Sequence, residues 1–489
     1  MNESPKKPFY ITTTLPYVNA PLHIGHALEF VRADTIARYK KLTGHEVFFN
    51  SGTDEHGIKI LKKAEENNVE VKTFVDQAFD TFKNQISQFG LLEDIHFERT
   101  TEASHEEAAQ EFWRLVDKAG FIYKKSYTAK YCASCEEEKT DSQLNEKGEC
   151  LEHPGKPVET IDEENYFFKY SAFQDKLLAF YDEHPNFIIP DTRYNEIKTF
   201  VKSGLRDFSI SRLKSKMSWG VPVPGDEDHV MYVWFDALTS YISGLGWPTD
   251  KEGNYKKYWE EAVRVQYCGK DNTRFQGAMW QAMLIAAGLP NSDHIVVNGH
   301  ITAEGGVKMS KSLGNVVDPL EIANTYGTDA LRYFLLREIN AFEDSPFTME
   351  RFKDSYNSGL ANGLGNLTSR IMKMAESNNV SVPEGGEIYF GINQPAVESL
   401  DRFNVSEYMS EIWSDIQNLD GYIQKNEPFK KIKVDEEAGK KDIQYLLTHL
   451  RGIALRLEPV MPETSQKIQD LIKSNKIPET PLFARLETK

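Results

Sequence analysis

The feature that most constrains the fold is an alternation of short apolar runs with helical segments near the start of the chain. "FYITTT" (9–14) is rich in apolar and β-branched residues, and residues 24–42 carry apolar side chains at helical spacing. The order recurs at "EVFFNSG" (46–52), which a helical segment follows from about residue 58, and a helix rich in acidic residues over about 102–119 closes this part. Such alternation predicts right-handed βαβ units around a parallel sheet. Ligands of these sheets bind at the carboxyl ends of the strands, where "PYVNAPLHIGH" and "SGTDEHG" both fall.

The pattern is interrupted and later resumes. Residues 120–228 contain a cysteine cluster, short strand-like runs and polar turns, whereas "HVMYVWFDALTSYI" (229–242) again predicts a strand running into a helix. "VQYCGKD" and "HIVVNGHI" predict two further strands, so the middle region is an insertion that splits one parallel-sheet domain. Beyond about residue 350 strand signals fade and periodicity predicts a helix bundle. Its helices are expected at 351–375, 405–425, 440–457 and 463–474, with a polar connection over 376–399.

Composition bounds the class of protein. The 489 residues are enough for two or three domains, 27% of them are charged, and no long apolar run predicts a membrane span. The start, "MNESPKKPFY", lacks an apolar signal core, and four cysteines do not make a disulfide scaffold, so we expect a cytoplasmic protein. The net charge of −17 argues against nonspecific binding to nucleic acid, but an RNA partner needs only a local basic face.

Two histidines flank a glycine at the corner between the first strand and the first helix: His23, Gly25 and His26. A single histidine there is usually solvated or satisfied by neighbours. Two of them at a helix N-terminus predict a site for an anion, because the first turn offers unpaired N–H groups and the positive end of the helix dipole. Glycine also lets a ligand approach the backbone closely.

A second anion site is predicted in "KMSKS" (308–312), which follows Gly305 and Gly306. The alternative is an ordinary solvated loop. Two lysines and two hydroxyls in one loop suit a polyphosphate, and Lys308 and Lys311 can neutralise charge that develops as pyrophosphate leaves.

Four residues have the spacing of zinc ligands. Cys132 and Cys135 form a C-x2-C pair, and Cys150 and His153 form a C-x2-H pair fourteen residues later. Three thiolates and one imidazole make a closed tetrahedral site, hence a structural one. A disulfide is the rival interpretation, and Cys268, in an apolar strand, is expected to be an ordinary buried thiol.

"HIGH" and "KMSKS", in that order, resemble the two signatures of class I aminoacyl-tRNA synthetases. "PYVNAPLHIGH", "GTDEHG", "YVWFDAL" and "SISR…WGVPVPG" narrow the resemblance to the methionyl-tRNA synthetases, across nearly the whole chain. The resemblance implies ATP-dependent activation of methionine and transfer to the 3′-terminal ribose of tRNA(Met), for elongation and initiation of translation. It also implies Mg-ATP as a substrate and a structural zinc ion in the insertion.

The resemblance refines the domains. We expect a Rossmann-like α/β catalytic domain over 1–118 and 229–300, split by a zinc-binding connective peptide over 119–228. A "KMSKS" loop and stem-contact region is expected over 301–350, and an all-α anticodon-binding domain over 351–489.

The resemblance also implies a methionine pocket. Asp54 would take the ammonium group, and an aromatic and apolar wall would surround the thioether. At the position where this family commonly has a histidine, the chain has Gln276, which leaves the details of side-chain recognition open. The implied pocket residues are Leu15, Tyr17, Asp54, Trp234, Ala237, Leu238, Tyr241 and Gln276.

For ATP, the family roles fall on residues of the two signatures and on "GKD". His23, Gly25 and His26 would meet phosphate oxygens, Lys308 and Lys311 the developing pyrophosphate, and Gly269 and Asp271 the adenosine. We treat His23, His26, Lys308 and Lys311 as the candidate catalytic residues.

The helical region expected after residue 350 also resembles the anticodon-binding part of this family. Asn366 and Arg370 lie four residues apart on one helix face, as in the anticodon readers of the family. Phe429 follows a proline where the family stacks a base on tryptophan, and "FKKIK" makes a basic patch around it.

Three rivals remain at this point. Leucyl, isoleucyl and valyl enzymes share both signatures but carry a large editing domain. A pantothenate-synthetase-like ligase shares the HxGH corner but needs no helix bundle or zinc knuckle. A non-catalytic RNA-binding relative predicts damaged signatures, whereas both are intact here. No extra module is recognised after the helical region, so we expect a monomer.

Overall fold

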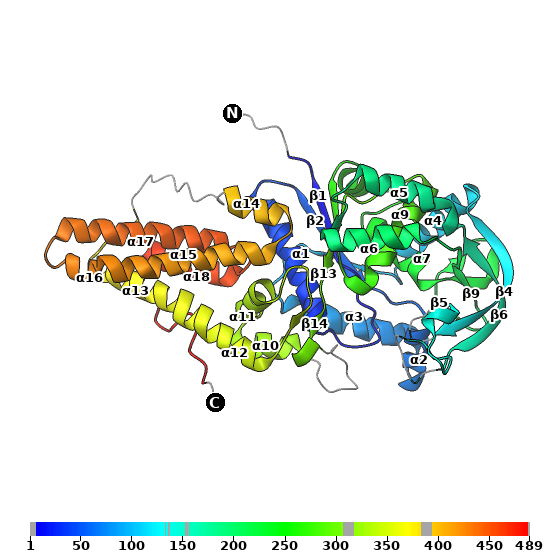
Figure 1. Ribbon diagram of the computed structural model, residues 1–489, viewed down its shortest axis with the longest axis horizontal. Coiled ribbons are helices and arrows are strands. Elements are labelled where there is room, and N and C mark those ends of the chain that lie inside the picture. Colours follow the sequence, from blue (N-terminus) through cyan, green and yellow to red (C-terminus); the bar gives the residue numbers. More distant parts are fainter. Residues whose placement is uncertain are drawn as a thin grey trace. The chain divides into compact units, whose positions relative to one another are not determined.

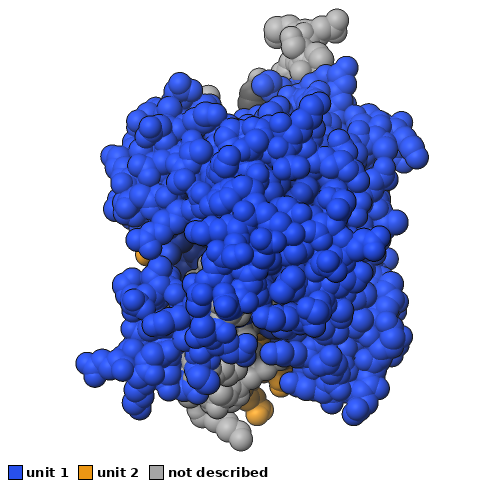
Figure 2. Space-filling view, turned by 90° about the vertical axis from the view of Figure 1, so that its right-hand side faces the viewer, with its two compact units in different colours: residues 1–21, 44–84, 94–297 blue, residues 22–43, 85–93, 298–489 orange. Residues whose placement is uncertain are grey.

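The computed structural model describes residues 6–132, 134, 137–151, 155, 157–306, 317–382 and 394–487. They form two compact units, coloured separately in Figure 2. Unit 1 comprises residues 1–21, 44–84 and 94–297, and unit 2 comprises residues 22–43, 85–93 and 298–489.

Unit 1 is built on a six-stranded sheet in the order β3-β2-β1-β12-β13-β7. β1 lies between β2 and β12 and is parallel to both, with Ile11 opposite Phe49 on one side and Val265 on the other. Buried apolar residues fill these strands, as two-sided coverage of a parallel sheet requires. The prediction of a parallel-sheet α/β domain is confirmed. The strands are β1 (Phe9–Thr12), β2 (Val47–Thr53), β3 (His96–Arg99), β7 (Ile188–Ile189), β12 (Val263–Gly269) and β13 (His294–Asn298).

The core of unit 1 is unusually aromatic. Phe112 stacks on Trp280 with 5.5 Å between ring centroids, and Trp259 contacts Trp280 edge to face at 6.3 Å. All three rings are buried. The helices that supply this core and cover the sheet are α2 (Ile58–Glu66), α3 (Val71–Ser87), α4 (Ala103–Lys118), α5 (Gln174–Glu183), α6 (Asp191–Lys202), α7 (Val233–Ala237), α8 (Ser240–Ser243) and α9 (Trp280–Ala287), with the π-helical turns η3 (Lys256–Glu260) and η5 (Phe275–Met279).

The region predicted as an insertion contains two small antiparallel sheets. In the first, β4 (Ile122–Cys132) and β6 (Glu159–Phe168) pair along their length and form the long ribbon visible in Figure 1. β5 (Glu137–Lys139) and β8 (Phe208–Ser209) extend this sheet. The second contains β9 (Ser211–Leu213), β10 (Pro222–Val223) and β11 (Asp226–Met231).

Two strands have pairings that the sequence did not predict. β11 does run into a helix, α7, but it pairs antiparallel with β9 and β10 rather than joining the parallel sheet. β7, from within the predicted insertion, pairs with β13 and forms an edge of the parallel sheet. The insertion therefore completes the sheet that it interrupts.

Unit 2 contains the first helix, α1 (Ile24–Leu42), together with the helical C-terminal region. The fully buried Arg332 holds α1 within this unit, because its guanidinium pairs with Asp34 at 2.7 Å and donates to the carbonyl oxygens of Phe89 and Val460. A buried arginine needs several acceptors around its guanidinium group to offset the cost of removing the charge from water.

The predicted helix bundle is present in unit 2, where α13, α15, α17 and α18 run side by side (Figure 1). Its helices are α13 (Asn366–Ser377), α15 (Val405–Asn426), α16 (Pro428–Lys431), α17 (Glu436–Leu457) and α18 (Pro462–Ser474). Before the bundle come a parallel pair, β14 (Ile301–Thr302) and β15 (Ser345–Pro346), and the helical segments α10 (Pro319–Tyr326), α11 (Thr328–Tyr333), η8 (Phe334–Glu338), α12 (Met349–Ser355) and η9 (Tyr356–Gly365).

The predicted polar connection over 376–399 lies partly outside the described residues. At its ends, α13 continues to Ser377 and α14 (Gln394–Asp401) begins at Gln394. Within the described parts of both units, none of the helices combines the length and apolar character needed to cross a membrane.

Candidate active site

The first wall of the candidate site forms where β1 and β2 end. Beyond the strands their pairing continues: the amide of Val18 donates to the carbonyl of Asp54 at 3.2 Å, and the amide of Asp54 donates to the carbonyl of Pro16 at 3.0 Å. Tyr17 and Asp54 are therefore directly opposite each other. Leu15 is buried two residues before Tyr17. Three of the predicted methionine-binding residues meet at this edge of the sheet.

The second wall comes from α7, α8 and the π-helical turn η5. Trp234 stacks face to face on Phe275, with 3.8 Å between centroids and 4° between planes. Ala237, Leu238 and Tyr241 are buried at 9%, 1% and 3% exposure, and the backbone carbonyl of Tyr241 accepts a hydrogen bond from the Tyr10 hydroxyl at 2.7 Å. That bond attaches the second wall to β1.

Gln276 joins the two walls. Its Nε2 donates to Thr14 Oγ1 at 2.9 Å, next to Leu15 in the chain, and its neighbour Phe275 carries the stack on Trp234. The side chain is fully buried, and its Oε1 accepts no hydrogen bond from the residues that the structure describes. All eight predicted pocket residues thus belong to four segments of unit 1, which backbone pairing and side-chain hydrogen bonds link together.

Gly269 and Asp271 follow the neighbouring strand. Gly269 is the last residue of β12, and Asp271 lies in the single turn η4 (Lys270–Asn272) that comes directly after it. Since β12 pairs with β1 in parallel, these residues lie at the same edge of the sheet as Leu15 and Tyr17.

His23, Gly25 and His26 lie at the N-terminus of α1, in unit 2. Gly25 N–H donates to His23 Nδ1 at 3.1 Å, and His23 N–H donates to His26 Nδ1 at 3.2 Å, a reciprocal cap in which both imidazoles accept through Nδ1. Each neutral ring therefore carries its proton on Nε2. The rings stack at 3.8 Å. Burial, with a smaller contribution from His23, lowers the pKa of His26 to about 3, so His26 acts as a neutral donor.

Gly25 leaves room for this arrangement. A Cβ at this position would lie 3.0 Å from Cε1 and 3.1 Å from Nδ1 of His23, so that ring would have to shift by a few tenths of an ångström. Besides letting a ligand approach the backbone, as the sequence predicts, glycine leaves room for the neighbouring imidazole.

The anticodon candidates lie in the helix bundle. Asn366 begins α13 and is exposed, and Arg370, one turn later, pairs through Nη1 with Asp420 of α15. Phe429 is 43% exposed on α16, which follows α15. An exposed phenylalanine with Lys430 near its ring, at 5.9 Å, offers a stacking surface.

Comparison with known proteins identifies the family. A family model described as tRNA synthetases class I (M) matches residues 9–372. The chain belongs to this family.

Two relatives and one solved structure are similar to nearly the whole of this chain. The methionine–tRNA ligase of Caldanaerobacter subterraneus is 42% identical over 95% of this chain and 73% of its own length, and that of Rhizobium meliloti is 38% identical over 95% and 92%. A solved structure, Mycobacterium tuberculosis methionyl-tRNA synthetase in complex with methionyl-adenylate, is similar with a TM-score of 0.89 and 36% identity over 99% of both chains.

The remaining synthetase signature and half of the cysteine cluster lie outside the described residues. These are Lys308, Lys311, Cys135 and His153. Cys132 is the last residue of β4, and the backbone of Cys150 pairs with that of Leu144 in an isolated antiparallel β-bridge. Both thiols are buried, at 2% and 1% exposure. Among the residues that are described, none gather as a group of three or more metal ligands.

Three residues that contribute to the site are absent from the set predicted from the sequence. Thr14 and Phe275 act through their contacts with Gln276 and Trp234, and Asp420 acts through Arg370. Phe275 precedes Gln276 by one residue, so the "GKD" segment could have pointed to it. Nothing local distinguishes Thr14 within "ITTT" or Asp420 within α15.

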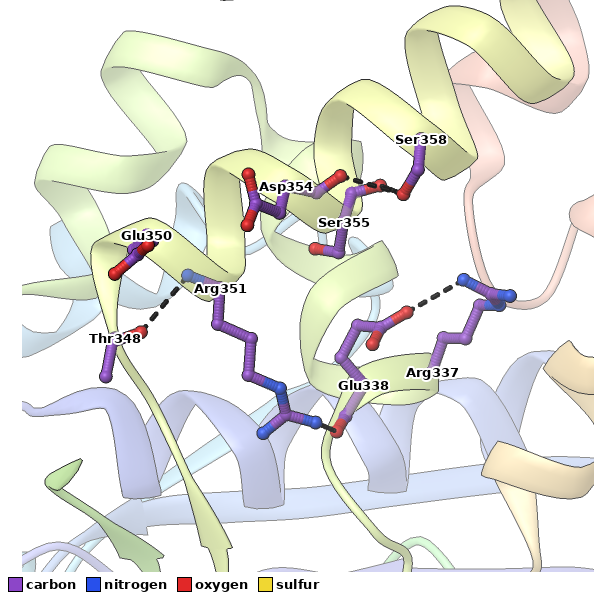
Figure 3. Close-up of a pocket in the computed structure, with 8 residues that line it drawn as sticks. All are labelled: Arg337, Glu338, Thr348, Glu350, Arg351, Asp354, Ser355 and Ser358. Carbon is purple, nitrogen blue, oxygen red and sulfur yellow. Dashed lines mark hydrogen bonds and ion pairs between the residues drawn. The ribbon is translucent and has the colours of Figure 1, made fainter. Parts of the chain in front are cut away.

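Unit 2 also contains an open, charged cavity of about 550 Å³ (Figure 3). Its arginines are already engaged by the protein: Arg351 donates to the carbonyls of Pro346 and Glu338, and Arg337 pairs with the Glu338 carboxylate at 2.7 Å. Because both guanidinium groups have acceptors of their own, we assign this cavity no ligand.

Proposed function

We propose that this chain is a methionine–tRNA ligase that activates methionine with Mg-ATP and charges tRNA(Met). The observation that supports the proposal is that Gln276 donates to Thr14, beside Leu15, while its neighbour Phe275 stacks on Trp234, which joins three distant segments of the chain. The family match and the adenylate complex of the tuberculosis relative support it.

The pocket recognises the two ends of methionine by different chemistry. Asp54 takes the ammonium group as a carboxylate at the end of a strand. Leu15, Tyr17, Trp234, Ala237, Leu238 and Tyr241 surround the side chain, since a polarizable thioether gains from aromatic and apolar contacts. Gln276 orients the sulfur end through the amide that Thr14 holds in place.

In the first step the methionine carboxylate attacks the α-phosphorus of ATP. A C–O–P bond forms, and the bond between α-phosphorus and the bridging oxygen breaks as pyrophosphate leaves. The nucleophile is already an anion, so positioning and charge stabilisation supply most of the rate. His23 and His26 donate from Nε2 to phosphate oxygens, beside Gly25 and the N-terminus of α1. Lys308 and Lys311 neutralise the leaving pyrophosphate, and Gly269 and Asp271 hold the adenosine.

In the second step the terminal ribose hydroxyl of tRNA attacks the methionyl carbonyl, and AMP leaves. Asn366 and Arg370 bind the anticodon by hydrogen bonds, and a base stacks on Phe429. We further propose that the chain works in the cytoplasm as a monomer.

Cys132, Cys135, Cys150 and His153 would hold a zinc ion. The two described thiols fit this role because both are buried and thiolate sulfur is a preferred ligand of zinc. When bound, zinc supplies a closed tetrahedral cross-link and takes no part in the reaction.

The decisive experiment is exchange of labelled pyrophosphate into ATP, without tRNA, in the presence of methionine, leucine, isoleucine, valine or cysteine. Strongest exchange with methionine is expected. Stronger exchange with another amino acid would contradict the assigned pocket, and none with any amino acid would contradict the proposed activity.

A further inference from the structure

A chain of buried ionisable residues crosses unit 1 beside the candidate pocket and belongs to none of the roles assigned above. Its central members are Glu98 at the end of β3, His105 on α4 and Asp236 on α7, with exposures of 3%, 0% and 0%. Ser243 of α8 and His56, which follows β2, complete it and are also buried. Three ionisable groups that are almost completely buried need a reason to be there.

The hydrogen-bond directions determine the protonation of His105. Ser243 Oγ donates to Glu98 Oε1 at 2.7 Å, so it can only accept from His105 Nδ1, which lies 2.8 Å away. On the other side of the ring, Nε2 lies 2.7 Å from Asp236 Oδ1, and a carboxylate only accepts. Both ring nitrogens therefore carry a proton, which makes His105 an imidazolium.

The charges around the ring agree with this assignment. Burial alone would lower the pKa of His105, but its bonds to Asp236 and Glu98 raise the pKa to about 10. Burial would raise the pKa values of Glu98 and Asp236, but histidine partners lower both to about 2. The charged groups that face His105 are these two carboxylates. His56 lies behind Asp236, at 2.8 Å from its Oδ2, and His96 behind Glu98, at 3.3 Å from its Oε2.

Asp236 connects this network to both walls of the pocket. It lies on α7 between Trp234 and Ala237, and its second oxygen binds His56, two residues after Asp54. α7 spans five residues and no side chain caps its N-terminus, so it is too short to be stable alone. One buried carboxylate thus fixes the rotation of the aromatic wall relative to the segment that carries Asp54.

We propose that His105 is a positioning residue for methionine binding: as an imidazolium held between Glu98 and Asp236, it fixes α7 and therefore the wall of the pocket that carries Trp234. The inference rests on the proposed function, because methionine is the ligand of that pocket. His105 lies behind the wall, contacting Asp236 and Ser243, and acts through them.

The first test is His105→Gln, measured by methionine-dependent pyrophosphate exchange. Glutamine keeps one donor but removes the charge, which leaves two buried carboxylates without their cation. We expect the KM for methionine to rise by about tenfold or more, because small displacements of a binding wall are costly, while the KM for ATP changes less than about twofold. His184→Gln, an exposed histidine on the same unit that contacts the Phe180 carbonyl, is the matched control and should behave as wild type.

A second variant keeps the test decisive if His105→Gln does not fold. Ser243→Ala removes the hydroxyl that bridges His105 and Glu98 but keeps their direct ion pair at 3.6 Å and the contact with Asp236, so it should raise the methionine KM by a smaller factor. Asp236→Asn added to His105→Gln removes one unpaired charge and should recover part of the methionine affinity. A folded His105→Gln with unchanged methionine KM, or with both KM values raised equally, would overturn the inference, as would an unchanged methionine KM in Ser243→Ala.

Nuclear magnetic resonance measures the charge of His105 directly, independently of how the side chain packs. In protein labelled with ¹⁵N-histidine, both ring nitrogens of His105 should show the shift of protonated nitrogen at pH 8, and an unprotonated nitrogen would contradict the imidazolium. Failure of the proposed function has a different signature. Wild-type protein would then show no methionine-dependent exchange, whereas failure of this inference leaves wild-type exchange intact.

Discussion

Gln276 donates a hydrogen bond to Thr14 across 262 positions of sequence, with 2.9 Å between Nε2 and Oγ1. Thr14 in turn donates to the carbonyl of Tyr267 in β12, so its hydroxyl has a lone pair for the amide and a proton for the backbone. The order of donors therefore fixes which end of the Gln276 amide faces Thr14. At this position the chain has an amide whose orientation is set by its partner.

The first prediction concerns that partner. Thr14→Val keeps the shape of the side chain and removes the acceptor, which leaves a buried N–H of Gln276 without a partner at a cost of about 1–3 kcal/mol. The KM for methionine in pyrophosphate exchange should rise at least about fivefold, with little change in the KM for ATP. Thr81→Val, on the exposed face of α3, removes a comparable hydroxyl and should have no effect. An unchanged methionine KM in Thr14→Val would show that Thr14 does not orient Gln276.

The second prediction concerns the donor at the start of α1. His26→Ala removes one Nε2–H aimed at phosphate, and loss of one such donor typically lowers a rate by about 10²–10³-fold. Stopped-flow measurement of adenylate formation should show a loss in that range, with the dissociation constant for methionine unchanged. His45→Ala, a half-buried histidine in unit 1, is the control. A loss of methionine affinity without a loss of rate would contradict the phosphate role.

The third prediction follows from the pKa of His26, which burial lowers from 6.5 to about 3. Below pH 6.5 the unfolded chain takes up a proton at this position, whereas the folded chain does so only near pH 3. Acidification between these values therefore favours unfolding, and the contribution of His26 to stability is kept above pH 6.5 and lost as the pH falls. The free energy of unfolding of His26→Gln, measured by urea titration at pH 7 and pH 5, should decrease less than that of wild type. An equal decrease would mean that His26 is exposed to protons in the folded state.

The sequence predicted the parts of this molecule that depend on local patterns. The strands around Ile11 and Phe49 could be predicted because buried strands are apolar runs bounded by turn residues. The pocket segments could be placed because parallel strands end at one edge. By contrast, β7 has two residues, too few for any period, and its pairing with β13 is decided by tertiary packing.

The buried network shows a different limit of sequence reasoning. In "TEASHEEAAQ" the residue His105 is surrounded by acidic neighbours on a surface-type helix, a pattern typical of a solvated histidine. Its partners Glu98 and Asp236 come from other elements, and the fold alone brings them to one point. Polar residues that act through long-range partners have no local signal, whereas signatures such as "HIGH" hold several functional groups in one short segment.

The fourth prediction concerns the cysteines. Protein washed with a mild chelator should retain about one zinc ion per chain, as a closed site of three thiolates and one imidazole binds tightly. Cys150→Ser replaces a ligand by a weak one and should lose most of the zinc, measured by mass spectrometry of the metal. Cys268→Ala, a buried thiol on β12, should keep it. Equal zinc in Cys150→Ser and wild type would remove Cys150 from the ligand set.

The fifth prediction concerns Phe429, the 43% exposed ring on α16. Stacking of one base on an aromatic side chain is worth about 1–3 kcal/mol, and the gain increases with the area of the ring. Phe429→Ala should therefore raise the KM for tRNA(Met) about 5- to 150-fold, and Phe429→Trp should lower it below the wild-type value. Pyrophosphate exchange without tRNA should be unchanged in both variants, because the ring belongs to the helix bundle and not to the pocket of unit 1. Ile477→Ala, another exposed apolar residue of unit 2, serves as the control for surface truncation. If Phe429→Ala charged tRNA(Met) with wild-type KM, the anticodon would be read without stacking on this ring, and the basic residues beside it would have to supply the affinity alone.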